Sequence, residues 1–207
     1  NKLAIPGKEG KRSYIWPSGV HPYCGYSTRL REVAKHGVSE SRFQGVFDKI
    51  HTCGYYPVWL DGYNVGGKTF FNLIFRHANA RWQARINMTG ARYQKEFKKW
   101  TRSGYRPIHV DSYLRKGKIR YAALWKKSKG FKYTAYHGKT ANSHQKSFEK
   151  LTRRGYAPVN VSSVVVQGRR RVTALYEKKN VGGFHLKSEM TLKQYNAFFK
   201  QYNKRGF

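Results

Sequence analysis

The hydrophobic residues of this chain recur in a fixed order about every fifty residues. Three segments align in register: SRFQGVFDKIHTCGYYPVWLDGY from Ser41, ARYQKEFKKWTRSGYRPIHVDSY from Ala91 and NSHQKSFEKLTRRGYAPVNVSSV from Asn142. A fourth, KQYNAFFKQYNKRGF from Lys193, runs to the last residue. The corresponding phenylalanines are Phe47, Phe97, Phe148 and Phe199. Self-similarity at one period indicates a tandem repeat architecture.

Each unit contains the pattern of an amphipathic helix. Apolar residues fall at i, i+4 and i+7, as at Phe43, Phe47 and Ile50, and therefore share one helical face. A hydroxyl residue suited to capping the helix precedes each pattern, at Ser39, Thr89, Thr140 and Thr191. A glycine suited to the left-handed residue after a helix follows it, at Gly54, Gly104, Gly155 and Gly206. We therefore expect one helix in each unit.

Strand patterns follow each helix. In the first unit Val58 and Leu60 are alternating apolar residues of a predicted strand, a Gly66-Gly67 turn follows, and a second strand runs through Phe71–Phe75. A third short segment leads into the next cap and begins at Trp82, Tyr133 or Phe184. The predicted fold class is α+β, with tandem repeats of one helix plus a two- to three-stranded antiparallel sheet.

The pattern divides a single repeat domain, 1–207, into five parts. These are an N-terminal hairpin and arm (1–38), three repeats (39–88, 89–139 and 140–190) and the helix of a split fourth repeat (191–207). Residues 1–16 resemble the hairpin that the fourth unit lacks, since Tyr14 to Trp16 match Tyr121 to Trp125. We predict that this hairpin closes a four-unit pseudo-symmetric domain; the alternative is an unrelated arm.

The repeated motif resembles a known family. It reads Ser/Thr-x3-Tyr-Gln-x2-Phe-x6-Gly-Tyr-x-Pro-x-x-Val-x-x-Tyr, followed by Gly and Tyr-Ala-Ala-Leu-Trp. The second unit matches it best, through Thr89, Tyr93, Gln94, Phe97, Gly104, Tyr105, Pro107, Val110, Tyr113, Gly117 and Tyr121 to Trp125. It is similar to the bacterial tandem repeat domain, which also occurs in the N-terminal region of fungal polyglycine hydrolases. The resemblance implies a secreted, non-catalytic accessory or recognition module.

The sequence contains no recognisable catalytic or metal site. The Ser-Asp-Asn and Lys-Thr-Gly partners that the Ser-x-x-Lys motif of β-lactamase-like enzymes requires are missing, and no paired Cys-x2-Cys or His-x3-His occurs. We therefore expect no enzyme activity, no cofactor and no metal. Asp61 and Asp111 recur at one repeat position, where the third unit has Ser162, and are interpreted as structural turn acceptors. Cys24 and Cys53 are the only cysteines; they form either a disulfide or two free buried thiols.

Charge is the extreme property of the chain. Lys and Arg total 42 against 10 Asp and Glu, which gives a net charge of +32. Residues 89–139 hold 15 basic and 2 acidic residues, whereas residues 39–88 hold 6 and 3. The repeat therefore exists in a nearly neutral version, and the added charge indicates a polyanionic partner. The predicted polyanion-binding residues are Arg115, Lys116, Lys118, Arg120, Lys126, Lys127, Lys129, Lys132, Arg153, Arg154, Arg169, Arg170 and Arg171.

Several partners fit this charge. We expect a secreted, extracellular, non-enzymatic scaffold that bridges polyanions: an acidic protein, a sulfated glycan or an anionic mineral such as silica. In composition the chain is similar to the basic proteins that accompany silica in sponge skeletal filaments. The alternatives are a carbohydrate- or peptide-recognition module related to hydrolase accessory repeats, a nucleic-acid-binding protein and, least favoured, a cryptic hydrolase. No run of apolar residues is long enough to span a membrane, and higher-order assembly is compatible with a bridging role.

Overall fold

The computed structural model describes residues 31–78, 80–128, 130, 132–187 and 190–207. The predicted N-terminal hairpin, Cys24 and Lys129 lie outside the described residues. Closure by the hairpin, and the pairing of Cys24 with the buried Cys53, therefore stay predictions.

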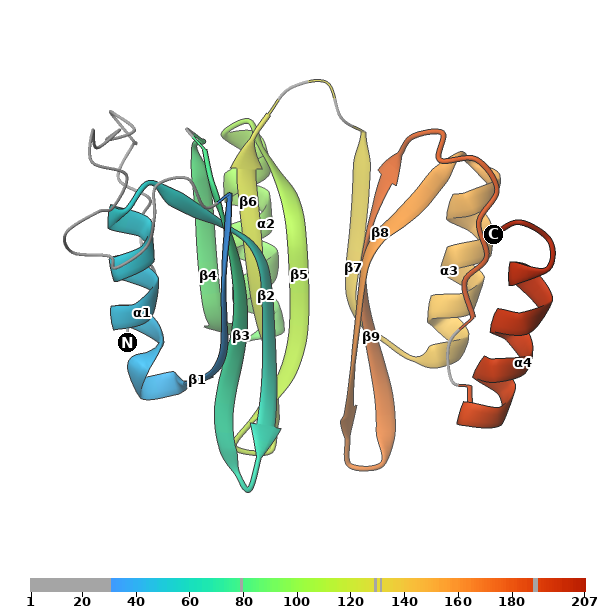
Figure 1. The fold of residues 1–207 in the computed structure, drawn as a ribbon, viewed down its shortest axis with the longest axis horizontal. Helices are drawn as coiled ribbons and strands as arrows, with labels where there is room; N and C mark the ends of the chain where they lie inside the picture. Colours follow the sequence, from blue (N-terminus) through green and yellow to red (C-terminus); the bar gives the residue numbers. More distant parts are fainter. Residues whose placement is uncertain (1–30, 79, 129, 131, 188–189) are drawn as a thin grey trace.

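Three complete units follow one another along the chain (Figure 1). The first contains β1 (Glu32–Ser39), α1 (Glu40–Thr52), β2 (Tyr55–Val65) and β3 (Lys68–His77). The second contains β4 (Trp82–Met88), α2 (Gly90–Arg102), β5 (Tyr105–Arg115) and β6 (Lys118–Lys127). The third contains β7 (Tyr133–Lys139), α3 (Ala141–Arg153), β8 (Tyr156–Val166) and β9 (Arg169–Lys178), and α4 (Leu192–Asn203) comes last. The α+β class and the helix-plus-sheet repeat are confirmed.

Each unit forms its own three-stranded antiparallel sheet, with orders β1-β3-β2, β4-β6-β5 and β7-β9-β8. The short segment that begins at Trp82 therefore hydrogen-bonds to the sheet of the following helix, opposite Lys126, and not to the sheet before it. The structural unit starts with this strand, several residues ahead of the cap that marks it in the sequence.

The first strand of a unit also packs on the helix of the preceding unit. The same ring contact recurs three times, with centroids 5.5 Å apart for Phe47 and Trp82, 6.2 Å for Phe97 and Tyr133, and 6.3 Å for Phe148 and Phe184. Each contact joins a helix to the segment that starts the next unit. The repeats consequently share cores instead of folding as separate modules.

The predicted helix ends agree with the structure. Ser39, Thr89, Thr140 and Thr191 are the N-cap residues, and all but Ser39 accept a backbone N–H through their hydroxyl. The glycines after the helices have left-handed φ angles of 83°, 77°, 77° and 81°, for Gly54, Gly104, Gly155 and Gly206.

The edge strands β2, β5 and β8 pack against one another in succession, while the helices cover the outer faces of the sheets (Figure 1). Asp111 Oδ2 accepts the backbone N–H of Gly62 at 2.7 Å, and Asp111 Oδ1 accepts the Ser162 hydroxyl at 2.6 Å. Ser162 in turn accepts the backbone N–H of Ser112 at 2.9 Å. The interpretation of Asp111 as a turn acceptor was wrong, because this carboxylate is buried between units and joins all three of them.

A second polar contact reinforces each junction. His109 Nε2 lies 2.6 Å from the Leu60 carbonyl oxygen, and burial lowers the pKa of His109 to about 4, so the neutral ring donates this bond. At the next junction the Val110 N–H donates to Asn160 Oδ1 at 2.6 Å. His109 and Asn160 occupy one repeat position, so the same place in the repeat joins successive units.

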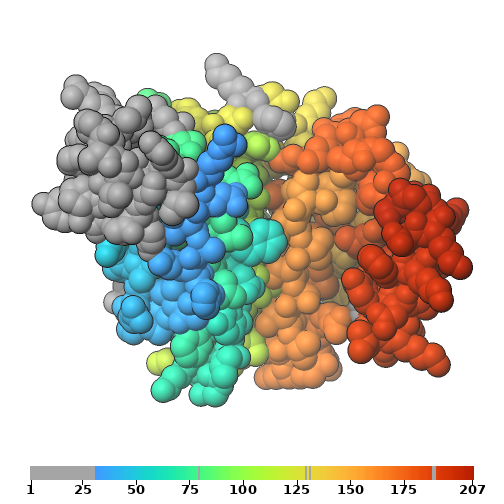
Figure 2. Space-filling model, in the orientation of Figure 1, coloured from blue at the N-terminus to red at the C-terminus, as the bar shows by residue number. Residues whose placement is uncertain are grey.

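The last helix has no sheet of its own among the described residues. Tyr195 and Phe199 correspond to the buried Phe43 and Phe47 of α1, yet they are 50% and 59% exposed. Figure 2 shows α4 in red at the end of the molecule away from α1. The segment at Phe184, where the repeat pattern places a third short strand, forms no strand among the described residues.

Candidate functional site

The structure divides the predicted basic residues between two opposite ends of the molecule (Figure 1). The β5–β6 and β8–β9 hairpins turn at one end, which contains Arg115, Lys116, Lys118, Arg120, Arg169, Arg170 and Arg171. The opposite end contains the ends of β6 and α3 and the start of β7, with Lys126, Lys127, Lys132, Arg153 and Arg154. Lys129 belongs to the connection from β6 to β7 but lies outside the described residues. The predicted residues therefore do not form one site.

At the hairpin end, some of these side chains already have protein partners. Arg115 Nε donates to Glu40 Oε1 at 2.7 Å, which ties the second unit to the start of α1. Arg120 donates to the Ile119 carbonyl at 2.9 Å. Lys116 and Lys118 are exposed at the turn of the hairpin. This end combines a structural ion pair with exposed cations.

At the opposite end, two lysines lie over aromatic rings. Lys126 Nζ is 4.9 Å from the ring centroid of Tyr56, and Lys127 Nζ is 5.5 Å from that of Tyr105. Such contacts hold an ammonium group close to the surface without neutralising its charge. Arg153 and Arg154 are exposed at the end of α3.

Sequence reasoning missed a third basic surface, the outer face of α2. Arg92, Lys95, Lys99 and Arg102 share one helical side at i, i+3, i+7 and i+10, and Lys98 lies beside them. All five are exposed, and together with Glu96 they line an open depression of about 710 Å³. We call these five residues the α2 basic face.

The other helices repeat this face only in part, since α1 keeps Arg42 and Lys49 and α3 keeps Lys146, Lys150 and Arg153. Gly45, Asp48 and Thr52 of α1 stand at the positions of Lys95, Lys98 and Arg102. In α3 the position of Lys98 is taken by Glu149. Comparing the outward helical positions of successive repeats would have revealed the α2 basic face from the sequence. A charge count over residues 89–139 does not show this face, because it does not separate helical positions from turns.

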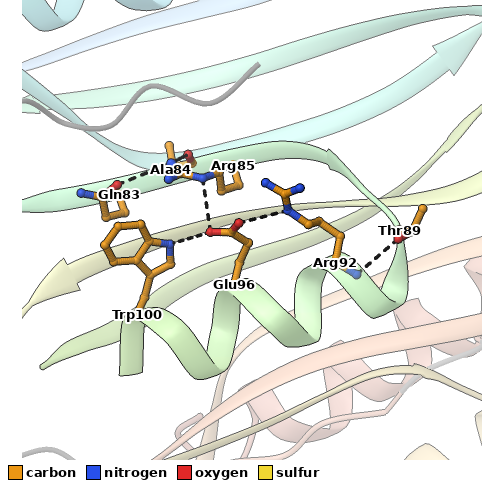
Figure 3. Close-up of polar contacts among 7 residues, drawn as sticks. All are labelled: Gln83, Ala84, Arg85, Thr89, Arg92, Glu96 and Trp100. Carbon is orange, nitrogen blue, oxygen red and sulfur yellow. Dashed lines mark hydrogen bonds and ion pairs between the residues drawn. The ribbon is translucent and has the colours of Figure 1, made fainter. Parts of the chain in front are cut away.

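A buried glutamate, Glu96, points from α2 toward Arg85 of β4 (Figure 3). Glu96 is 6% exposed and accepts bonds from Arg92 Nε and from the Trp100 indole N–H, both at 3.0 Å. Arg85 of β4 approaches the same carboxylate, with Nε 3.4 Å from Glu96 Oε2. One acid in the most basic unit thus holds two guanidinium groups and an indole.

Trp100 lies between two cations. The Arg85 guanidinium is 5.2 Å from its ring centroid and Lys99 Nζ is 4.8 Å from it. Burial lowers the pKa of Arg85, and the nearby Glu96 carboxylate opposes that effect. Arg85, Trp100 and Glu96 therefore form a bonded cluster next to the exposed lysines of α2.

Within the described residues, no three His, Cys, Asp or Glu side chains are arranged to hold a metal ion. No described helix is long and apolar enough to cross a membrane. Burial lowers the pKa of His109 to about 4 and raises that of Asp111 to about 6, and both side chains are hydrogen-bonded between units.

The chain matches the polyglycine hydrolase-like structural repeat, BTRD1, over residues 31–78, 79–128, 130–179 and 182–207. The chain belongs to this family. The boundaries of the BTRD1 repeats agree with sheets that begin at β1, β4 and β7, and the fourth repeat contains α4. No curated protein matches the chain.

Proposed function

We propose that this BTRD1 protein is a secreted, non-enzymatic basic scaffold that bridges polyanions. The observation that carries the proposal is the contrast between α1 and α2. Both helices bury the same aromatic face in the same fold, but only α2 exposes five cations on its outer side. Because α1 folds with cations at only two of these positions, Arg42 and Lys49, the other three cations of α2 are not required by the fold.

The placement of the basic groups supports a bridging role. They occur at both ends of the three-unit body and on one side of it, so one molecule can contact more than one anionic chain or surface. A net charge of +32 concentrates anions near the protein, and arginines bind sulfate, phosphate or carboxylate through two parallel bonds. Acidic proteins, sulfated glycans and anionic minerals such as silica share this chemistry.

Retention on heparin, silica and DNA matrices, followed across a salt gradient, tests the proposal. Binding through released counterions gives a logarithmic affinity that falls linearly with the logarithm of salt concentration. Elution from all three matrices at low salt would overturn it. Retention on DNA alone would favour the nucleic-acid alternative, and salt-insensitive retention on an uncharged polysaccharide would favour a recognition module.

We also propose that residues 1–16 complete the fourth unit. The exposed Tyr195 and Phe199 on α4, and the exposed Val161 and Val165 on β8, are the apolar surfaces that such a hairpin would cover.

Deleting residues 1–16 tests closure through the melting temperature, which we expect to fall sharply. Phe199→Ser provides an independent test with Leu192→Ser, also on α4, as its matched control. Closure predicts a loss of about 3 kcal/mol for Phe199→Ser, as for a buried aromatic, and little change for Leu192→Ser. An unchanged melting temperature after the deletion would refute closure.

A further inference from the structure

We propose that the α2 basic face is a preorganised site for a linear sulfated glycan and that Glu96 is its positioning residue. This inference rests on the proposed function and assigns one ligand class to one surface. It also predicts that an acidic residue strengthens the binding of an anion, the opposite of what net charge predicts.

The shape of the surface indicates a linear ligand. At 1.5 Å of rise per residue, Arg92 and Arg102 are about 15 Å apart along α2, with three lysines between them. A series of anionic groups on an extended chain can contact these cations in succession. A single small anion would use only one or two of them.

The chemistry of the surface favours a glycan over a nucleic acid or a peptide. Single-stranded nucleic acids stack their bases on aromatic side chains, but the Trp100 ring has Arg85 and Lys99 against it. The residues that line the depression are all charged, and none is an apolar anchor of the kind that peptide grooves use. Sulfate groups on a sugar chain require only cations and hydrogen-bond donors.

Glu96 gives this surface a fixed element. It engages Arg92 through Nε at 3.0 Å, so the two Nη groups of the same guanidinium remain for a ligand. It also fixes the Trp100 ring over which Lys99 Nζ lies. A side chain that is already held loses less conformational freedom on binding than a flexible one does.

Glu96→Gln separates positioning from charge. The variant is nearly isosteric, and the loss of one carboxylate raises the net charge of the protein by one unit. Glu149→Gln on α3 is the matched control, because it makes the same change at an exposed glutamate that bonds only to Gln145 in its own helix. Arg92→Lys provides a second variant that keeps the charge and removes the Nε donor. Melting temperatures verify that each protein is folded.

Isothermal titration of a heparin-derived oligosaccharide measures the effect. We expect Glu96→Gln and Arg92→Lys to bind roughly threefold to tenfold more weakly than the wild type, and Glu149→Gln to bind as tightly or more tightly. Glu96→Gln binding as tightly as Glu149→Gln would overturn the positioning role. The assignment to sulfated glycans would be overturned if Glu96→Gln weakened the binding of inorganic polyphosphate to the same extent. It would also be overturned if the desulfated oligosaccharide bound.

The outcomes also distinguish this inference from the broader proposal. A wild-type protein that is retained on heparin at moderate salt, with the same retention for all three variants, contradicts the α2 site and leaves polyanion binding intact. A wild-type protein that elutes at low salt from heparin, silica and DNA contradicts the proposed function itself.

Discussion

Asp111 accepts the backbone N–H of Gly62 at 2.7 Å, although the two residues belong to different repeats and lie on different sheets. The bond places a carboxylate between β2 and β5, where burial raises its pKa to about 6. Hydrogen bonds from Ser162 and Gly62 oppose this rise and do not cancel it. The junction between units thus contains a buried carboxylic acid whose hydrogen-bond donors are uncharged.

Replacing Asp111 with Asn is expected to remove a pH dependence of stability. The folded-state pKa is about 6 and the ordinary value is 3.8, so the folded protein binds this proton more tightly than the unfolded chain. The contribution to the free energy of unfolding is fully present below about pH 4 and is lost as the pH rises to about 6. Urea unfolding at pH 4 and at pH 7 measures this: over that range the wild type should lose about 3 kcal/mol more of its free energy of unfolding than Asp111→Asn does. A wild type that becomes more stable relative to Asp111→Asn as the pH rises would contradict the prediction.

Replacing Gly62 with Ala is expected to destabilise the junction. A Cβ at this position would lie 2.7 Å from Cδ1 of the buried Tyr113 ring, which requires the two units to separate. We expect a loss of about 1–3 kcal/mol in the free energy of unfolding. Gly45→Ala is the control: it lies in α1 with open space around it and is expected to stabilise the protein by about 0.5–1 kcal/mol. Equal effects of the two substitutions would refute the close approach.

Removing the N-cap hydroxyls is expected to have unequal effects in different repeats. The Thr89 hydroxyl accepts the Arg92 N–H at 3.3 Å, whereas Ser39 makes no such bond and its hydroxyl lies 3.1 Å from that of Ser41. Thr89→Ala should therefore cost about 1 kcal/mol and Ser39→Ala only a few tenths. Thermal unfolding compares them, and a larger loss at Ser39 would show that this description of the caps is wrong.

The repeat itself could be predicted because its signals are local. The caps, the glycines after the helices and the spacing of residues such as Phe43 and Phe47 all act within one unit, and each agrees with the structure. The sequence could not predict to which sheet the strand at Trp82 belongs, because this strand packs on the helix of one unit and hydrogen-bonds to the sheet of the next. The repeat period is the same whether the strand ends one unit or begins the following one.

The sites were harder to predict because they depend on which side chains face outward. Arg115 stood out in the sequence as part of a basic turn, but Glu40, 75 residues earlier, pairs with it. Lys95 and Lys98 lie on a helix whose sequence pattern is that of an ordinary amphipathic helix. These lysines matter because they lie next to Glu96, which is buried against Arg85 of β4. That contact depends on the tertiary structure and leaves no signal in the sequence of the helix.

The salt concentration at which the protein elutes from heparin, measured for two triple variants, tests the location of binding most directly. Lys95→Gln, Lys98→Gln and Lys99→Gln together neutralise the α2 basic face. Lys193→Gln, Lys200→Gln and Lys204→Gln remove the same charge from exposed positions on or just after α4. We predict that the α2 variant elutes at clearly lower salt than the α4 variant. Equal elution of the two would show that total charge alone governs binding and would contradict this account.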